Sequence, residues 1–210
     1  MSKMEILIAG HGGQGVLLLG DYLAYTAMLQ GKHVACTPSY GPETRGGRTK
    51  CYVIISDEVI DNPIVEEPDV EIIMNQQSME FLRYLRPNGL ILYNESLIGA
   101  DIGRTDVRIL KLPATEIAEG LKNELPASDK LDSQMFANAV MYGAFLEKCM
   151  HGVTEEYLQE TLKHFLEGKK ASLTFLNHSA IEKGRQYVRA GMSQEDLREA
   201  TTASNPSPLM

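Results

Sequence analysis

Apolar runs and segments of helical period alternate along the first half of the chain. Residues 6–9 form an apolar run that predicts a buried strand, and residues 16–29 repeat their apolar side chains with the period of a helix. A further helix, capped by Ser78 and running to Leu85, is expected before the turn Pro87-Asn88-Gly89. Short apolar runs predict further strands at residues 33–37, 51–56, 70–74, 90–93 and 107–112.

The second half of the chain has a predominantly helical pattern. Helices are expected at residues 115–121, 133–150, 154–165 and 173–189, and the polar residues 191–210 predict a disordered tail. Strands that alternate with helices indicate an α/β fold with a Rossmann-like open, mostly parallel sheet that carries helices on both faces. We therefore expect a single domain over residues 1–190, with a helical C-terminal part.

Composition and charge exclude several classes of protein. The chain has 210 residues and a formal net charge of −8, and it lacks the basic stripe that binding to nucleic acid requires. No apolar run approaches the ~18 residues of a membrane-spanning helix. The N-terminal apolar run leads directly into a glycine turn, so it is a poor signal peptide. We therefore expect a cytoplasmic protein with no nucleic-acid and no membrane partner.

The cysteines Cys36, Cys51 and Cys149 are widely separated and form no C-x-x-C pair. These cysteines alone can therefore build neither a zinc site nor an iron–sulfur cluster. We interpret them as buried thiols in a reducing compartment, and we expect the chain to bind no metal.

Four glycines crowd the six positions after the first strand, in the sequence G-H-G-G-Q-G. They match G-x-G-x-x-G between a strand and a helix, where backbone N–H groups at the helix N-terminus bind phosphate. A dinucleotide site also needs an acidic residue at the end of the second strand, and Cys36-Thr37-Pro38 offers none. The glycines therefore bind an anion or only permit tight strand–helix packing. The candidate residues are Gly10, Gly12, Gly13, Gln14 and Gly15, with the Gln14 amide facing a ligand or capping the helix.

A second distinctive stretch, P-S-Y-G-P-E-T-R-G-G, covers residues 38–47. It follows the second strand at the same sheet edge as the glycine turn, and ligands of open α/β sheets bind at that edge. The alternative is an ordinary long turn held by a contact between Glu43 and Arg45. We expect Arg45 to matter most, because its guanidinium binds phosphate or carboxylate through paired donors. The candidate residues of this loop are Ser39, Tyr40, Glu43 and Arg45.

Together, the two stretches resemble the gamma subunit of the 2-oxoacid:ferredoxin oxidoreductases. The same unit is a domain of single-chain pyruvate:ferredoxin oxidoreductases. Thr44 departs from the family pattern, which has methionine there, and residues 48–50 replace small neutral ones. The resemblance spans roughly residues 4–190 and is carried by G-H-G-G-Q-G-V (10–16), P-S-Y-G-P-E-T-R-G-G (38–47), C-Y-V-I-I-S-D (51–57), P-D-V-E-I-I-M-N-Q (68–76), P-N-G-L-I-L-Y-N (87–94) and P-A-T-E-I-A (113–118).

The resemblance implies a complex that oxidatively decarboxylates a 2-oxoacid on thiamine diphosphate and releases an acyl-coenzyme A. In the family, alpha and beta subunits hold thiamine diphosphate, and a ferredoxin-like delta subunit holds the iron–sulfur clusters that reduce ferredoxin. This chain has no G-D-G…N-N thiamine motif and too few cysteines for a cluster, so we expect an accessory subunit without catalytic residues. By itself it would hold neither thiamine diphosphate nor a cluster, and coenzyme A is the one ligand left open for it. Its role would be to support assembly and to position coenzyme A.

Several alternatives stay open at this point. As a separate chain, the sequence looks closest to the 2-oxoglutarate type, while pyruvate and branched-chain 2-oxoacids remain alternatives. A stand-alone nucleotide-dependent reductase with a Rossmann-like site is the rival function. A scaffold whose glycines are purely structural is the third interpretation.

Overall fold

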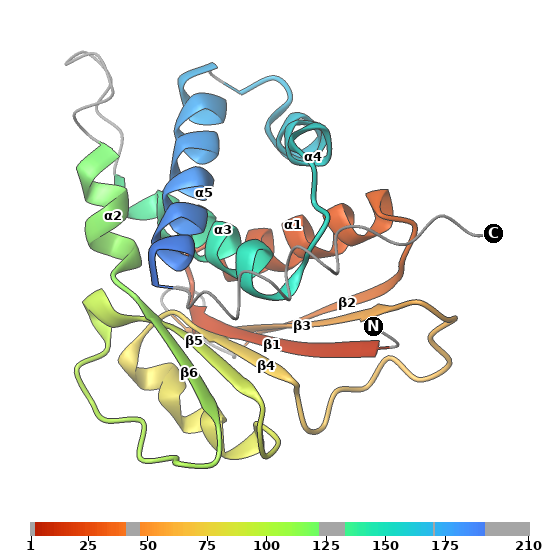
Figure 1. Ribbon diagram of the computed structural model, residues 1–210, viewed down its shortest axis with the longest axis vertical. Helices are drawn as coiled ribbons and strands as arrows, with labels where there is room; N and C mark the ends of the chain where they lie inside the picture. Colours follow the sequence, from red (N-terminus) through yellow and green to blue (C-terminus); the bar gives the residue numbers. More distant parts are fainter. Residues whose placement is uncertain (1–2, 41–46, 122–132, 170, 192–210) are drawn as a thin grey trace.

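The computed structural model describes residues 3–40, 47–121, 133–169 and 171–191, and these form one layered α/β unit (Figure 1). The described strands form one sheet in the order β2-β3-β1-β4-β5-β6. Strands β1, β4, β5 and β6 run parallel, whereas β3 is antiparallel to both of its neighbours. The strands are β1 (Lys3–His11), β2 (His33–Tyr40), β3 (Arg48–Ser56), β4 (Val70–Ile73), β5 (Leu90–Asn94) and β6 (Arg108–Leu112).

The α-helices lie on one face of this sheet, with α1 and α3 above the strands and α4 and α5 farther out (Figure 1). Alternate strand residues, such as Ile6 and Ile8 of β1, point into the core between the sheet and these helices. Helices α3 and α5 cross closely at Gly143, which has no Cβ. A Cβ there would lie 2.0 Å from the Ile181 carbonyl oxygen, so only glycine permits this approach. The helices are α1 (Val16–Leu29), α2 (Ala114–Gly120), α3 (Ala137–Cys149), α4 (Glu155–Leu166) and α5 (Ala171–Gly191).

A smaller core covers the opposite face of the sheet. There the 3-10 helix η1 (Gln76–Tyr84) packs Phe81 and Leu82 against Leu7, Ile73 and Ile91 of the strands. The short 3-10 turn η2 (Glu95–Leu97) follows β5. The expected α/β sheet with helices on both faces is therefore confirmed, with the α-helices on one face and η1 on the other.

Most of the predicted elements are present. Helix α1 has the predicted bounds, and the strands β1, β2 and β3 are longer than their apolar runs. The predicted Ser78 cap is wrong: Asn75 is the N-cap of η1, because its Oδ1 accepts a hydrogen bond from the Ser78 backbone N–H at 2.9 Å. The predicted helix at 133–150 begins with a 3-10 turn, η4 (Ser133–Phe136). The predicted tail lies outside the described residues except for Gly191, which ends α5.

Within the described part of the chain, no helix is both long enough and apolar enough to cross a membrane.

Candidate functional site

The two motifs predicted from the sequence meet at one edge of the sheet. Strands β1 and β2 point the same way, because each is antiparallel to β3, which lies between them. Their carboxyl ends therefore lie at the same edge of the sheet, on either side of the start of β3, with His11 opposite Arg48 and Tyr40 opposite Thr49. The predicted common edge is confirmed. The backbone N–H of Gly12 donates a hydrogen bond of 3.0 Å to the carbonyl of Gly47, so the glycine turn is tied to the end of the second motif.

The glycines of the turn have different roles. A Cβ at Gly10 would approach Val16 Cγ2 to 2.7 Å, so this glycine permits close packing of β1 on α1. Gly15 is the left-handed N-cap of α1, with φ of 70°, and a Cβ there would meet the amide of Asn138. Gly13 also has a positive φ, of 100°, but no described atom lies within 4 Å of the Cβ that it lacks. Among the described residues, nothing therefore blocks the approach of a ligand to the Gly13 backbone.

The Gln14 amide points inward and braces the turn. Its Oε1 accepts hydrogen bonds from the His11 backbone N–H at 3.0 Å and from Asn75 Nδ2 at 2.7 Å. Its Nε2 donates to the carbonyl of Met74 at 3.4 Å. The capping role considered for Gln14 is not found, because Gly15 caps α1 without a side-chain hydrogen bond. A ligand contact of Gln14 stays a prediction, and it would have to compete with these three bonds.

Two asparagines that the sequence analysis did not select hold the turn in place. Asn75 follows β4 and supports Gln14, and its position three residues before Ser78 is the local capping signal that could have found it. Asn138 near the start of α3 is buried, and its Nδ2 donates to the Gly15 carbonyl at 3.4 Å. No local signal could reveal Asn138, since 123 positions separate it from Gly15.

The second motif is described only at its two ends. Ser39 is half-buried near the end of β2, and the backbone of Tyr40 ends that strand. Glu43 and Arg45 lie outside the described residues, so their contact with each other and with a ligand stays a prediction.

The positive charges that depart from the family pattern face η1. Arg48 Nη1 lies 2.7 Å from Glu80 Oε1, and the Lys50 ammonium lies 4.8 Å from the centre of the Phe81 ring. Alternate residues of β3 point to opposite faces, so Arg48 and Lys50 point away from α1. These two charged side chains therefore contact η1 on the face of the sheet opposite α1.

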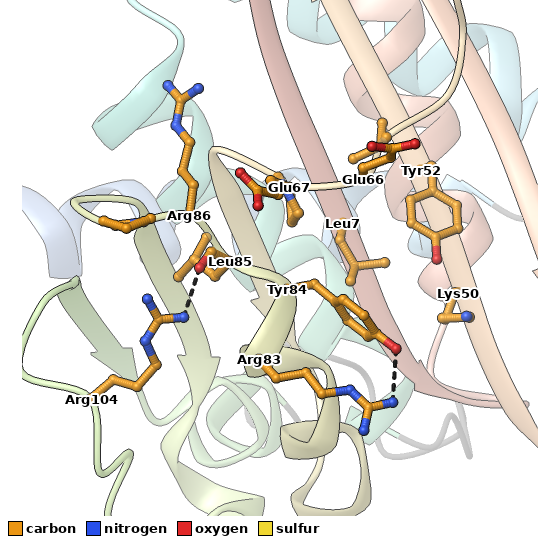
Figure 2. A pocket seen from close by; sticks show the side chains of 13 residues that line it. Leu7, Lys50, Tyr52, Glu66, Glu67, Arg83, Tyr84, Leu85, Arg86 and Arg104 are labelled. Atoms are coloured by element: carbon orange, nitrogen blue, oxygen red, sulfur yellow. Dashed lines mark hydrogen bonds between the residues drawn. The ribbon is translucent and has the colours of Figure 1, made fainter.

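A groove of about 770 Å³ occupies this opposite face. Figure 2 shows Lys50 and Tyr52 of β3 on one side and Arg83 and Tyr84 of η1 on the other, with Leu7 between them. Arg83 Nη2 donates to the Tyr84 hydroxyl at 2.7 Å. None of the described candidate residues of the glycine turn, nor Ser39, lines this groove.

Glu71 is a buried carboxylate in the sheet. It lies on β4 between Leu7 of β1 and Ile91 of β5, and its two carboxylate oxygens have no hydrogen-bond partner among the described residues. Burial raises the pKa of Glu71 to about 8, and the nearby positive charge of Arg104 acts in the opposite direction. Glu71 is therefore mostly protonated at neutral pH.

Within the described ranges, no group of three or more His, Cys, Asp or Glu side chains is arranged to hold a metal ion. Cys36, Cys51 and Cys149 are free thiols. What the motif edge offers instead is backbone N–H groups at the start of α1, whose first turn contains no acidic side chain. Such a helix N-terminus favours an anion, because the unpaired N–H groups and the helix dipole both carry partial positive charge.

The chain is similar to several known proteins. Residues 5–187 match the pyruvate ferredoxin/flavodoxin oxidoreductase family, POR. The chain is 35% identical over 194 residues to the ketoisovalerate oxidoreductase subunit VorA of Methanothermobacter thermautotrophicus, a match that covers 92% of the chain and 38% of VorA. It is 32% identical over 201 residues to the 2-oxoglutarate synthase subunit KorC of Methanothermobacter marburgensis, with 90% of the chain and 98% of KorC covered.

The fold is also similar to that of a solved enzyme, the 2-oxoglutarate:ferredoxin oxidoreductase from Magnetococcus marinus with 2-oxoglutarate, coenzyme A and succinyl-CoA bound. The TM-score is 0.79 at 22% identity, over 92% of this chain and 32% of that one. The chain thus spans less than half of VorA and of the Magnetococcus chain, but nearly all of KorC. The family match includes both motifs and confirms the resemblance. The chain therefore belongs to the pyruvate ferredoxin/flavodoxin oxidoreductase family.

Proposed function

We propose that this chain is an accessory, gamma-type subunit of a 2-oxoacid:ferredoxin oxidoreductase. This complex converts a 2-oxoacid to an acyl-coenzyme A and carbon dioxide and passes the electrons to ferredoxin. Family membership over residues 5–187 supports the proposal. The matched unit makes up nearly all of KorC and a smaller part of the longer VorA, so among the relatives it occurs both as a subunit and within a larger chain.

The partners in this proposal are alpha and beta subunits that bind thiamine diphosphate and a ferredoxin-like delta subunit that binds iron–sulfur clusters. This chain contributes no catalytic residue and holds neither of these cofactors. Similarity to KorC, a subunit of 2-oxoglutarate synthases, favours 2-oxoglutarate as the substrate. Similarity to VorA keeps a branched-chain 2-oxoacid as an alternative beside pyruvate, because VorA belongs to a ketoisovalerate oxidoreductase.

Within the complex, we assign to this chain the positioning of coenzyme A at the edge where the two motifs meet. One observation carries this assignment: the Gly12–Gly47 hydrogen bond joins both motifs beside the N-terminus of α1. The phosphates of coenzyme A are anions, and they suit backbone N–H groups at a helix N-terminus. No described atom lies near the missing Cβ of Gly13, so a phosphate could approach the backbone there, and Arg45 would add a guanidinium from the second loop.

The backbone N–H groups at the start of α1 are hydrogen-bond donors that suit a coenzyme A phosphate. The first turn of α1 is free of acidic side chains, so nothing in it repels a phosphate. The solved Magnetococcus enzyme of similar fold contains coenzyme A, which makes this ligand the first to test.

The test compares the isolated chain with the complex reconstituted from separately purified partner subunits. We expect the isolated chain to be inactive with 2-oxoglutarate, 2-oxoisovalerate or pyruvate, using coenzyme A and a viologen acceptor. Addition of this chain to the partner subunits should form a stable complex by size-exclusion chromatography and raise its coenzyme A-dependent turnover. An isolated chain that turns over any of these substrates would contradict the accessory role.

Titration calorimetry with NADH, NADPH, FAD and coenzyme A tests the rival reductase. A stand-alone reductase should bind a nicotinamide or flavin nucleotide without any partner subunit. Under our proposal, the heat of binding appears with coenzyme A and not with the three dinucleotides. Binding of NADH or NADPH by the isolated chain would favour the reductase instead.

A further inference from the structure

Two of the three cysteines lie in contact under the first turns of α1. Cys36 is on β2 and Cys51 is on the neighbouring strand β3, and their sulfur atoms are 3.4 Å apart. Cys36 lies opposite Val53 and Cys51 lies opposite Pro38, so the two cysteines form a diagonal pair across the strands. Both side chains pack against the core on the α1 face.

The two thiols differ in accessibility. Cys51 is buried, and a Cβ placed on Gly20 of α1 would come within 2.4 Å of its Sγ, so α1 covers it directly. Cys36 is half-buried on β2, which is the edge strand of the described sheet. Its Sγ also lies 3.9 Å from the carboxylate of Asp21. A small reagent from solvent therefore meets Cys36 first.

The contact also makes the two thiols chemically unequal. Either thiol can donate in this contact, but once Cys36 is a thiolate the Cys51 S–H is the donor. This hydrogen bond lowers the pKa of Cys36 even though burial and the Asp21 carboxylate oppose it. The same contact and burial raise the pKa of Cys51. Because the thiolate is the nucleophile in thiol chemistry, Cys36 is the more reactive member of the pair.

We propose that Cys36 and Cys51 form a reversible dithiol–disulfide pair, in which Cys36 is the attacking thiol and Cys51 the resolving thiol. The oxidant is a low-molecular-weight disulfide. The Cys36 thiolate attacks one sulfur of this disulfide, and the other sulfur leaves as a thiolate. Cys51 then attacks Cys36 Sγ and expels the second small thiol. The Cys51 proton goes to that leaving thiolate, so two protein thiols are oxidised and one small disulfide is reduced to two thiols.

Formation of the bond changes the strand that leads into the second motif. The sulfur atoms must approach from 3.4 Å to about 2.05 Å. Diagonal positions across antiparallel strands are farther apart than directly opposite ones, so one backbone must move. Strand β2 has a neighbour on only one side in the described sheet, and Ser39 follows Cys36 by three positions. Oxidation should therefore shift β2 toward Cys51 and add a covalent link between β2 and β3 beside the base of the second motif, where the two strands are already paired.

The experiment uses the full chain, which is reduced, freed of reductant and incubated with glutathione disulfide at neutral pH. The remaining thiols are alkylated in denaturant, and the products are identified by intact mass and peptide mapping. We expect the native chain to lose two hydrogens, with Cys36 linked to Cys51 and Cys149 alkylated. Dithiothreitol should restore two alkylatable thiols. The variant Cys149→Ser is the matched control and should form the same bond.

Single variants separate the two roles. Cys51→Ala should accumulate a glutathione adduct at Cys36, because no resolving thiol remains, whereas Cys36→Ser should carry no adduct at Cys51. Circular dichroism checks that both variants are folded. The proposal is overturned if the native chain keeps a stable glutathione adduct at Cys36, links two chains instead, or reacts only after unfolding. These outcomes depend on the native chain alone and not on the proposed oxidoreductase function.

Discussion

The side-chain amides of Gln14 and Asn75 are joined by a hydrogen bond of 2.7 Å from Asn75 Nδ2 to Gln14 Oε1. The Oδ1 of the same Asn75 accepts the backbone N–H of Ser78 and thereby caps η1. One buried side chain therefore connects the glycine turn with the 3-10 helix on the other face of the sheet. The shape of the candidate phosphate-binding turn depends on this connection.

The first prediction tests this connection by a double-mutant cycle. Gln14→Ala and Asn75→Ala should each lower the free energy of unfolding by about 1–2 kcal/mol, because each leaves buried polar groups without a partner. The double variant should lose less free energy of unfolding than the sum of the two single losses, and the difference, the coupling energy, should be about 1 kcal/mol. Urea unfolding measures these values. Gln77→Ala, an exposed position of the same 3-10 helix, is the control and should change little.

The second prediction separates backbone strain from ligand approach at Gly13. Gly13→Ala should cost about 1–2 kcal/mol of stability, because an L-residue is disfavoured at a positive φ. Gly31→Ala is a matched control: Gly31 has a φ of 77°, and no described atom lies near its missing Cβ either. The stability loss should therefore be similar in both variants. Coenzyme A affinity of the reconstituted complex should fall only in Gly13→Ala. If the Gly13→Ala and Gly31→Ala complexes bind coenzyme A with the same affinity, the glycine turn does not contact this ligand.

The third prediction concerns Arg45. Arg45→Lys keeps the charge but loses the planar guanidinium, so a bidentate contact with phosphate or carboxylate is lost. We expect a free energy of unfolding within about 1 kcal/mol of native, since a surface ion pair, if Arg45 forms one with Glu43, would contribute no more. Coenzyme A-dependent turnover or assembly of the complex should drop clearly. Arg48→Lys is the control, because Arg48 pairs with Glu80 on the other face. Unchanged turnover and assembly in Arg45→Lys would leave Arg45 with only a structural role in the loop.

The fourth prediction is a pH dependence of stability from Glu71. In the unfolded chain this carboxyl loses its proton near the ordinary pKa of 4.5, whereas the folded chain keeps it up to about pH 8. Between these values the folded state binds more protons, so stability falls as pH rises, by up to about 1.4 kcal/mol per pH unit. Glu71→Gln removes this titration. The variant should gain stability over the native chain as pH rises from about 5 to about 8, measured by urea unfolding.

A matched variant distinguishes this effect from a general loss of negative charge. Glu66 is an exposed carboxylate at the rim of the groove on the same face. Glu66→Gln removes the same charge from an exposed position, so a gain that is specific to the buried carboxyl should appear only in Glu71→Gln. If Glu71→Gln instead stays parallel to the native chain over this range, Glu71 is ionised in the folded protein.

Local patterns predicted much of the fold. The helical period between Val16 and Leu29 determined α1 to the residue, and the apolar runs located each described strand. The sequence also indicated that the glycine turn and the second motif, residues 38–47, lie at the same edge of the sheet. Such features can be predicted because turns, caps and periodic helix faces depend on residues that are close in the sequence. Strand ends and the η1 cap were predicted less well. Backbone pairing extends strands beyond their apolar residues, and Asn75 caps η1 in place of Ser78.

What the sequence by itself determined was therefore the set of elements and the two motifs; the tertiary structure decided which groups meet. The insertion of β3 between β1 and β2 brings Gly12 to Gly47 and Cys36 to Cys51. The position of β3 depends on which strands pair with each other. Strands with the same apolar pattern can pair with several partners at a similar free energy, so the pattern alone does not select the neighbour. The contact of Asn138 with Gly15 and the burial of Glu71 likewise arise only when distant elements pack. A side chain's partner and its desolvation are properties of the packed core, which no local period encodes.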